Sequence, residues 1–180
     1  MTDMDKTIKR AFDIAVETHE NIAKLIKRCK SLCRESGYEH LKKGRERDFI
    51  TWFDTLEPRS WSTRWFILPF RRKDSEKKAV YVMEINLYFP RVTVGKFVYE
   101  YTLDYSNIDR DIDSYSLPVD EYRDEYLYEE INGFTKATLR ANKSWANCIW
   151  FTEFPLSEIT ADNIQEKIFG TFDKLAELKS

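Results

Sequence analysis

The sequence is poor in glycine and histidine, and both shortages exclude familiar chemistries. Its five glycines are all isolated, so no glycine-rich loop can bring several backbone amides around a phosphate group. Only His19 and His40 are available for histidine-centred metal sites and catalytic triads. We therefore expect no cofactor and no metal, and we expect His19 to be a core or edge residue of a helix.

Long apolar runs are also absent. The longest, WFILPF at residues 65–70, has six residues, whereas a membrane-spanning helix needs about 20. The N-terminus shows no apolar segment of the kind found in signal peptides. The three cysteines are an odd number, and Cys29 and Cys33 lie one helical turn apart, which favours free, packed thiols. These features predict a cytoplasmic protein that does not associate with membranes, in which Cys148 is a small buried hydrophobe.

The chain does contain enough apolar side chain for a substantial core. Of its 180 residues, 42% are hydrophobic and 15% are aromatic, which argues against disorder. Neither a repeat nor a linker-like stretch divides the sequence. We therefore expect a single domain over residues 1–180.

The N-terminal third predicts one long helix, from Thr7 to Ser36, with Gly37 as its stop. One interpretation is an amphipathic helix lying across a sheet, and the other is a coiled-coil dimer. We favour the first because alanine, histidine and two cysteines make a weak zipper, although both monomer and dimer remain open. The seam residues, spaced alternately by four and three, are Ile8, Phe12, Ala15, His19, Ile22, Ile26, Cys29 and Cys33.

The middle of the chain predicts antiparallel strands. After the apolar run of residues 65–70, apolar side chains alternate over residues 79–89 and again over residues 96–105. Because the connection between the last two segments is short, we expect them to pair as a hairpin. Matching their aromatic faces would bring the carboxylates of Glu84, Glu100 and Asp104 together on the opposite face.

A second hairpin is indicated by Asn132-Gly133, which is a strong turn signal between two strand-like runs. A two-residue turn at this point would pair Glu129 with Lys136.

The remaining segments complete an α+β pattern. Residues 144–154 predict a last strand, Thr160 can cap a final helix, and residues 45–56 suit either a short helix or a strand. Runs of strands joined by short turns indicate an antiparallel sheet. We therefore expect an α+β fold: an antiparallel β-sheet of five or six strands with long N- and C-terminal helices packed on one face.

Acidic charge is concentrated in one stretch. Residues 104–130 hold ten acidic side chains, two arginines and five tyrosines. Acidic and tyrosine side chains set side by side suit the capture of a basic protein surface, although a solubilising segment explains the composition equally well. The candidate partner-binding residues, which we call the acidic strip, are Asp109, Asp111, Asp113, Tyr115, Asp120, Glu121, Tyr122, Asp124, Glu125 and Tyr126.

Part of the acidic strip resembles a calcium-binding loop. Asp109, Asp111 and Asp113 have the spacing of the first ligands, and Asp120 stands at the twelfth position. However, Ser114 replaces the glycine needed for the sharp turn, and Asp120 replaces a bidentate glutamate. We therefore expect no specific calcium binding.

Two functions follow from these patterns. The first is a non-catalytic intracellular protein-binding module, such as an inhibitor, an immunity-type protein or an adaptor, which uses the acidic strip. The alternative is a metal-dependent hydrolase of nucleic acid or nucleotides, with Glu84, Glu100 and Asp104 as ligands and the basic residues 24–47 holding phosphates. We favour the module, because a solvated sheet face explains the three carboxylates more simply.

Overall fold

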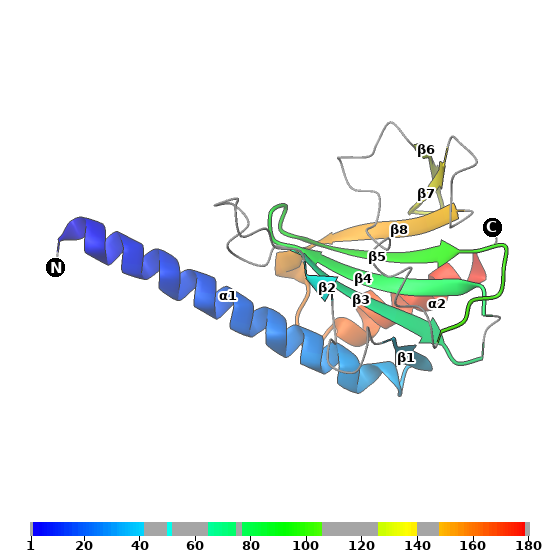
Figure 1. Ribbon diagram of the computed structural model, residues 1–180, viewed down its shortest axis with the longest axis horizontal. Helices are drawn as coiled ribbons and strands as arrows, with labels where there is room; N and C mark the ends of the chain where they lie inside the picture. Colours follow the sequence, from blue (N-terminus) through cyan, green and yellow to red (C-terminus); the bar gives the residue numbers. More distant parts are fainter. Residues whose placement is uncertain are drawn as a thin grey trace.

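The computed structural model describes residues 2–41, 50–51, 65–74, 77–105, 126–139 and 148–178. A long helix, α1 (Asp3–Cys33), comes first, and a short helix, α2 (Gly170–Glu177), comes last. Figure 1 shows both helices beside a twisted sheet. Its strands are β1 (Tyr38–His40), β2 (Ile50–Thr51), β3 (Trp65–Arg72), β4 (Ala79–Asn86), β5 (Arg91–Val98), β6 (Tyr126–Ile131), β7 (Phe134–Leu139) and β8 (Cys148–Pro155).

The sheet is antiparallel throughout, as predicted. Within the described residues, seven strands run in the order β1-β3-β4-β5-β8-β7-β6, and the two residues of β2 pair with β3 as well. The expectation of five or six strands was too low. The strands β1 and β2 have only three and two residues, so they leave no alternating pattern that the sequence could reveal.

The hairpin of β6 and β7 confirms the prediction made from Asn132-Gly133. Both turn residues have positive φ angles, of 53° and 79°, which is the conformation that a two-residue hairpin turn requires. Glu129 lies opposite Lys136, in the expected register.

The hairpin of β4 and β5 differs from the predicted one. β4 ends at Asn86, whose side-chain Oδ1 accepts hydrogen bonds from the backbone N–H groups of Tyr88 and Phe89, at 2.9 and 3.0 Å. This side chain closes a tight turn, and β5 therefore begins at Arg91. Residues 99–105 follow the end of β5, so the alternating pattern over residues 96–105 did not indicate the true strand.

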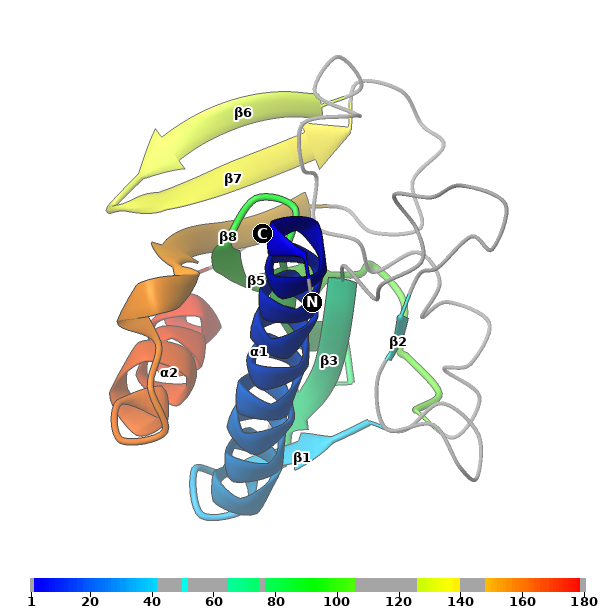
Figure 2. The same cartoon turned by 90° about the vertical axis from the view of Figure 1, so that its left-hand side faces the viewer.

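The main core lies between the sheet and the two helices. Figure 2 shows α1 and α2 on the same side of the sheet, as predicted. Aromatic rings fill much of this layer: the ring of Tyr38 lies 5.3 Å from those of Tyr81 and Phe172 and 5.9 Å from that of Phe169. The Tyr38 hydroxyl also donates a hydrogen bond to Asp173 Oδ1 (3.0 Å), which ties β1 to α2.

Only the N-terminal helix is long. The final helical segment consists of a π-helical turn, η6 (Gln165–Phe169), followed by the eight residues of α2. Thr160 does not occupy its N-cap position, which is held by Ile164 without a side-chain hydrogen bond. The Thr160 N–H instead donates to Asn163 Oδ1 in the turn that precedes the helix. The apolar spacing of the segment was nevertheless informative, since Ile164, Ile168, Phe172 and Leu175 are all buried.

The second face of the sheet is also buried at its central strands. All eight residues of β4 are buried, so side chains on both of its faces have little contact with water. The expectation of a solvated face is therefore wrong for the central strands. This second cluster includes Ile67, Val80, Val82, Phe97 and Ile149.

Candidate functional site

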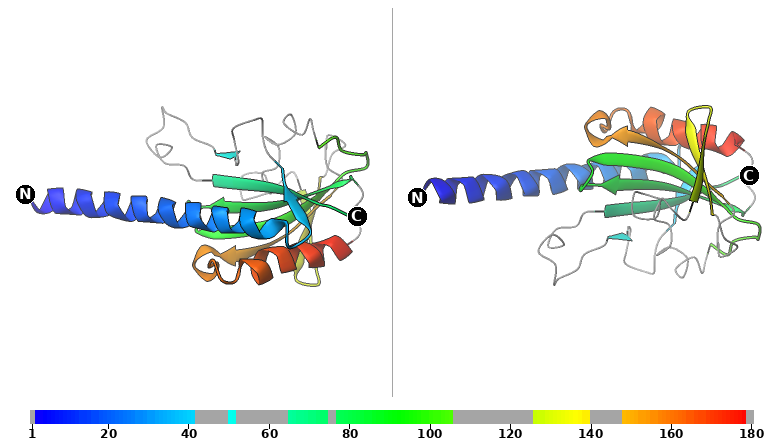
Figure 3. Two further views of the ribbon diagram at one scale, coloured as in Figure 1. Left: turned by 90° about the horizontal axis from the view of Figure 1, so that it is seen from below. Right: turned by 90° about the horizontal axis from the view of Figure 1, so that it is seen from above.

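Helix α1 is buried along one half and exposed along the other. Its buried side chains all lie between Ile22 and Cys33, where the helix packs on the sheet. Residues 3–18, which we call the α1 arm, extend past the end of the sheet (Figures 1 and 3). At 1.5 Å per residue the arm is about 24 Å long. The favoured interpretation, a helix lying across a sheet, therefore holds only for the second half of the helix.

The arm begins with a complete capping box. The Asp5 N–H donates to Thr2 Oγ1 (3.2 Å), and Asp5 Oδ2 accepts from the Thr2 N–H (2.6 Å). These bonds satisfy two of the amide groups that a helix start otherwise leaves unpaired. The bond from the Thr2 backbone also lowers the pKa of the Asp5 carboxyl.

Large apolar side chains project from the arm into solvent. The exposed fractions are 68% for Met4, 58% for Ile8, 71% for Phe12, 55% for Ile14 and 49% for Val16. Scattered exposed apolar residues are ordinary, but a contiguous group marks an interaction surface.

This exposed surface continues the buried face of the same helix. At 3.6 residues per turn, Met4, Ile8 and Ala15 fall on the side of α1 that carries Ile22 and Ile26. In the second half of the helix that side contacts the sheet, and in the arm it contacts nothing in the described part of the chain. An isolated helix of this length is marginal in water, because most helical stability in proteins comes from packing an amphipathic face. The arm therefore has the composition of a helix that packs against another surface.

A pocket of about 420 Å³ opens at the base of the arm, between α1 and the connection that leads from β8 to α2. This connection includes the short helix η5 (Leu156–Glu158). Elsewhere at the base, the ring of His19 lies 6.3 Å from that of Phe66, where α1 first meets the sheet. The pocket is lined by Thr18, Asn21, Ile22, Lys24, Leu25, Leu156, Ile159, Thr160 and Ala161.

The cations of the arm all lie in its first half. Residues 3–10 carry Lys6, Lys9 and Arg10 together with Asp3 and Asp5, whereas residues 11–18 carry Asp13 and Glu17 and no Lys or Arg. The described structure records one ion pair in the first group, between Lys6 and Asp3 (3.1 Å).

The turn between β4 and β5 is a second exposed apolar feature, and it lies at the same end of the sheet as the arm (Figure 1). The rings of Tyr88 and Phe89 are 4.6 Å apart, and the Arg91 guanidinium lies 5.5 Å from the Phe89 ring centre. Both aromatic side chains are exposed.

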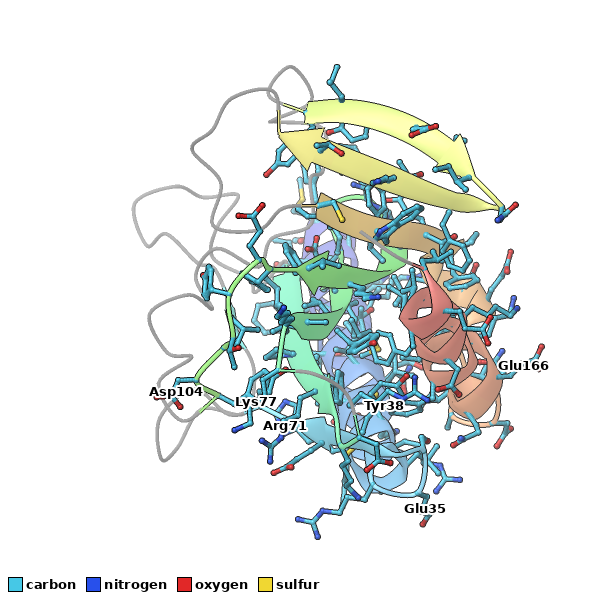
Figure 4. All side chains as sticks on the ribbon, turned by 90° about the vertical axis from the view of Figure 1, so that its right-hand side faces the viewer. Glu35, Tyr38, Arg71, Lys77, Asp104 and Glu166 are labelled. Carbon is cyan, nitrogen blue, oxygen red and sulfur yellow. The ribbon has the colours of Figure 1, made fainter. Side chains whose placement is uncertain are left out.

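The three carboxylates of the predicted metal site do not share a sheet face. Glu84 is 2% exposed within β4, opposite Thr93 of β5. Glu100 and Asp104 are exposed and lie beyond the end of β5, and Figure 4 shows Asp104 at the edge of the molecule away from α2. In the part of the chain that the structure describes, no three His, Cys, Asp or Glu side chains gather closely enough to hold a metal ion.

Almost all of the acidic strip lies outside the described residues, from Asp109 to Glu125. Its last member, Tyr126, is half-buried at the start of β6, with its ring 6.2 Å from that of Tyr128.

The cysteines are buried and carry free thiols, as predicted. Burial raises the pKa of Cys29, and the neighbouring Cys33 raises it further. Burial likewise raises the pKa of Cys148. These shifts oppose formation of the thiolate, which is the reactive form of cysteine.

Comparisons with known proteins find no protein-family model, no curated protein and no solved structure that matches this chain. Among the described residues, no helix combines the length and the apolar character needed to cross a membrane.

Proposed function

We propose that this protein is a non-catalytic protein-binding module whose contact surface is the apolar face of the α1 arm. The observation that carries the proposal is the continuity of one helix face, which is buried from Ile22 onward and exposed from Met4 to Ala15. The surface suits a partner that offers an apolar helix or groove, because amphipathic helices are recognised through residues spaced by three and four.

The proposal is tested by removing the apolar surface while keeping the helix. Ile8→Gln with Phe12→Gln replaces two exposed apolar side chains, and glutamine is a good helix former. Tagged wild type and variant are purified from the native cell, and bound proteins, including further copies of this chain, are identified by mass spectrometry. We expect the variant to lose the proteins that wild type retains.

The matched control is Lys9→Gln with Asp13→Gln, which alters the polar side of the same helical turns. This control should keep most of the binding, and circular dichroism should show equal helix content in all three proteins. Equal recovery of the same partners by wild type and by the Ile8/Phe12 variant would contradict the proposed function.

We propose the acidic strip as a second contact surface of the same module, directed at a basic partner. The support is its composition, in which acidic side chains alternate with tyrosines. Reversing Asp120, Glu121, Asp124 and Glu125 to lysine should abolish capture of a basic partner without unfolding the domain. Capture by wild type should also weaken as salt shortens the Debye length from about 30 Å to about 8 Å. Unchanged capture by the reversed variant would remove the strip from the proposal.

A further inference from the structure

We infer that the outward face of the second half of α1 binds the phosphate backbone of a nucleic-acid duplex without reading its sequence. The inference goes beyond the proposed function and does not depend on the α1 arm. In the sequence, residues 24–47 suggested phosphate binding only together with a metal site, whose three carboxylates do not come together. The described part of this segment nevertheless concentrates positive charge on one helix face. We call it the basic face, and it is made by Lys24, Lys27, Arg28, Lys30 and Arg34.

The basic face lies directly opposite the side of α1 that packs on the sheet. At 3.6 residues per turn, its five cations cover nearly half of the helix surface, and Ile22, Ile26 and Cys29 lie on the other half. Lys30 is half-buried, and the other four cations are exposed. Figure 3 (left) shows α1 in front of the strands when the molecule is seen from below, so the basic face is turned toward solvent.

Nearby acidic side chains do not balance this positive charge. Residues 21–34 contain the five cations and no Asp or Glu, and Glu35 follows only after the helix has ended. Among the described residues, no carboxylate forms an ion pair with Lys24, Lys27 or Arg28. These cations lie three and four residues apart, and like charges at that spacing repel one another and destabilise a helix. A bound polyanion would remove this repulsion.

The helix dipole explains only part of the basic face. Cations are favoured in the last turn of a helix, which accounts for Lys30 and Arg34. The effect fades within one turn, so it does not account for Lys24 and Lys27. Beyond β3, Lys73 adds a further exposed cation at the end of the face, because its ammonium group donates to the Arg34 carbonyl oxygen (3.3 Å).

The side chains between the cations decide which polyanion the basic face suits. They are Ala23 and Ser31, so the face offers no large apolar side chain for insertion into a lipid bilayer. It offers no aromatic ring either, whereas proteins that bind single strands stack the bases on aromatic side chains. Contacts to duplex phosphates need cations alone, because the release of condensed counterions favours binding. Such contacts carry no sequence information.

Binding is tested by fluorescence anisotropy with the purified full chain and a labelled DNA duplex of about 12 base pairs, which is roughly 40 Å long. We expect saturable binding with a Kd below about 100 μM at low salt, and a Kd within about two-fold of that for a duplex of unrelated sequence. Four to five phosphate contacts predict a slope of about −4 when the logarithm of the association constant is plotted against that of the salt concentration.

The basic face is removed by Lys24→Gln with Lys27→Gln and Arg34→Gln, which keeps good helix formers at three exposed positions. This variant should bind the duplex about ten-fold or more weakly at low salt. Its salt slope should flatten by about 0.9 for each cation removed. Circular dichroism should show that its helix content equals that of wild type.

The matched control is Lys6→Gln with Lys9→Gln and Arg10→Gln, which removes three cations from the first half of the same helix. It changes the net charge of the chain by the same amount as the first variant. It should bind the duplex within about two-fold of wild type, because these cations lie outside the basic face.

Three results would overturn the inference. One is a wild type that binds no duplex at low salt up to roughly 100 μM protein. Another is an equal loss of affinity in the variant and the control, which would mean that only the net charge of the chain matters. The third is tighter binding of a single strand of the same length, or of vesicles containing phosphatidylserine, which would assign the basic face to another polyanion.

Discussion

The ammonium group of Lys96 donates a hydrogen bond to the carbonyl oxygen of Leu175, with 3.0 Å between the two atoms. A second bond, to the carbonyl oxygen of Leu178, measures 2.8 Å. The middle of β5 thus supplies the C-terminal cap of α2, whose last carbonyl groups have no partners within the helix. Lys96 is only 7% exposed, so water cannot readily replace these bonds.

Lys96→Met should therefore destabilise the domain by about 1–3 kcal/mol, because it removes two charge-assisted hydrogen bonds to the carbonyl groups of Leu175 and Leu178 while keeping the apolar stem. Urea unfolding measures this difference. A loss below about half a kcal/mol would mean that the cap contributes little.

The buried ammonium group of Lys96 also predicts that the stability of the domain depends on pH. Burial lowers the pKa of Lys96 below its ordinary value of 10.5. Just below pH 10.5 the unfolded chain therefore binds more protons at this site than the folded chain does. The free energy of unfolding of wild type should consequently rise relative to that of Lys96→Met as the pH approaches 10.5. A constant difference between the two proteins would contradict this assignment.

Tyr81 should make the domain sensitive to alkali. Burial raises the pKa of its hydroxyl from 10.0 to about 12. Between these values the unfolded chain ionises Tyr81 and the folded chain does not, so stability is lost as the pH rises. The difference in free energy of unfolding between Tyr81→Phe and wild type should therefore be about 1 kcal/mol more favourable to the variant near pH 11 than at neutral pH. The control Tyr88→Phe alters an exposed hydroxyl and should show no such gain.

Packing of α2 on the sheet should account for a large part of the stability. Phe172 is wholly buried and contacts the rings of Tyr38, Phe70 and Tyr81. Phe172→Ala should cost about 3–5 kcal/mol in denaturant unfolding. Phe89→Ala, at an exposed turn position, should cost less than about 1 kcal/mol. Similar losses for both variants would show that the aromatic layer is not the main core.

Alanine substitutions at two glycines should change the stability of the domain in opposite directions. Gly133 has a φ of 79°, so Gly133→Ala should destabilise the β6–β7 hairpin by about 1–2 kcal/mol. Gly170 has a helical φ of −62°, and an added Cβ would meet the Gln165 carbonyl oxygen at an ordinary 3.7 Å. Gly170→Ala should therefore stabilise the domain by about 0.4–1 kcal/mol. Thermal melts of the two variants compare them directly, and a shift of the same sign in both would refute the argument.

Short sequence patterns correctly predicted those parts of the fold whose conformation depends on a few neighbouring residues. Asn132-Gly133 indicated a hairpin and its register, because only a few residues favour positive φ angles. The hairpin of β4 and β5 was misplaced because Asn86 closes the turn through its side chain, which leaves no characteristic pattern. The alternation from residue 96 to residue 105 resembles a strand equally well, and only tertiary contacts end β5 at Val98.

The candidate site was harder to predict for a related reason. The seam from Ile8 to Cys33 has the same spacing on both sides of His19, so nothing in it reveals that only the second half meets the sheet. Where the sheet ends relative to the helix depends on the length of β3 and on the position of the β4–β5 turn.

The change of surroundings along α1 should divide its amide protons into two exchange regimes. Amides between Ile22 and Cys33 are held by the core, so they exchange only when the whole domain opens. Amides of the arm in a single chain are protected by helical bonds alone, and fraying from the capped end exposes them far sooner. One uninterrupted helix would then contain a step in protection near His19. Binding of a partner along the arm would slow exchange of its amides, so hydrogen exchange would report complex formation directly from the backbone.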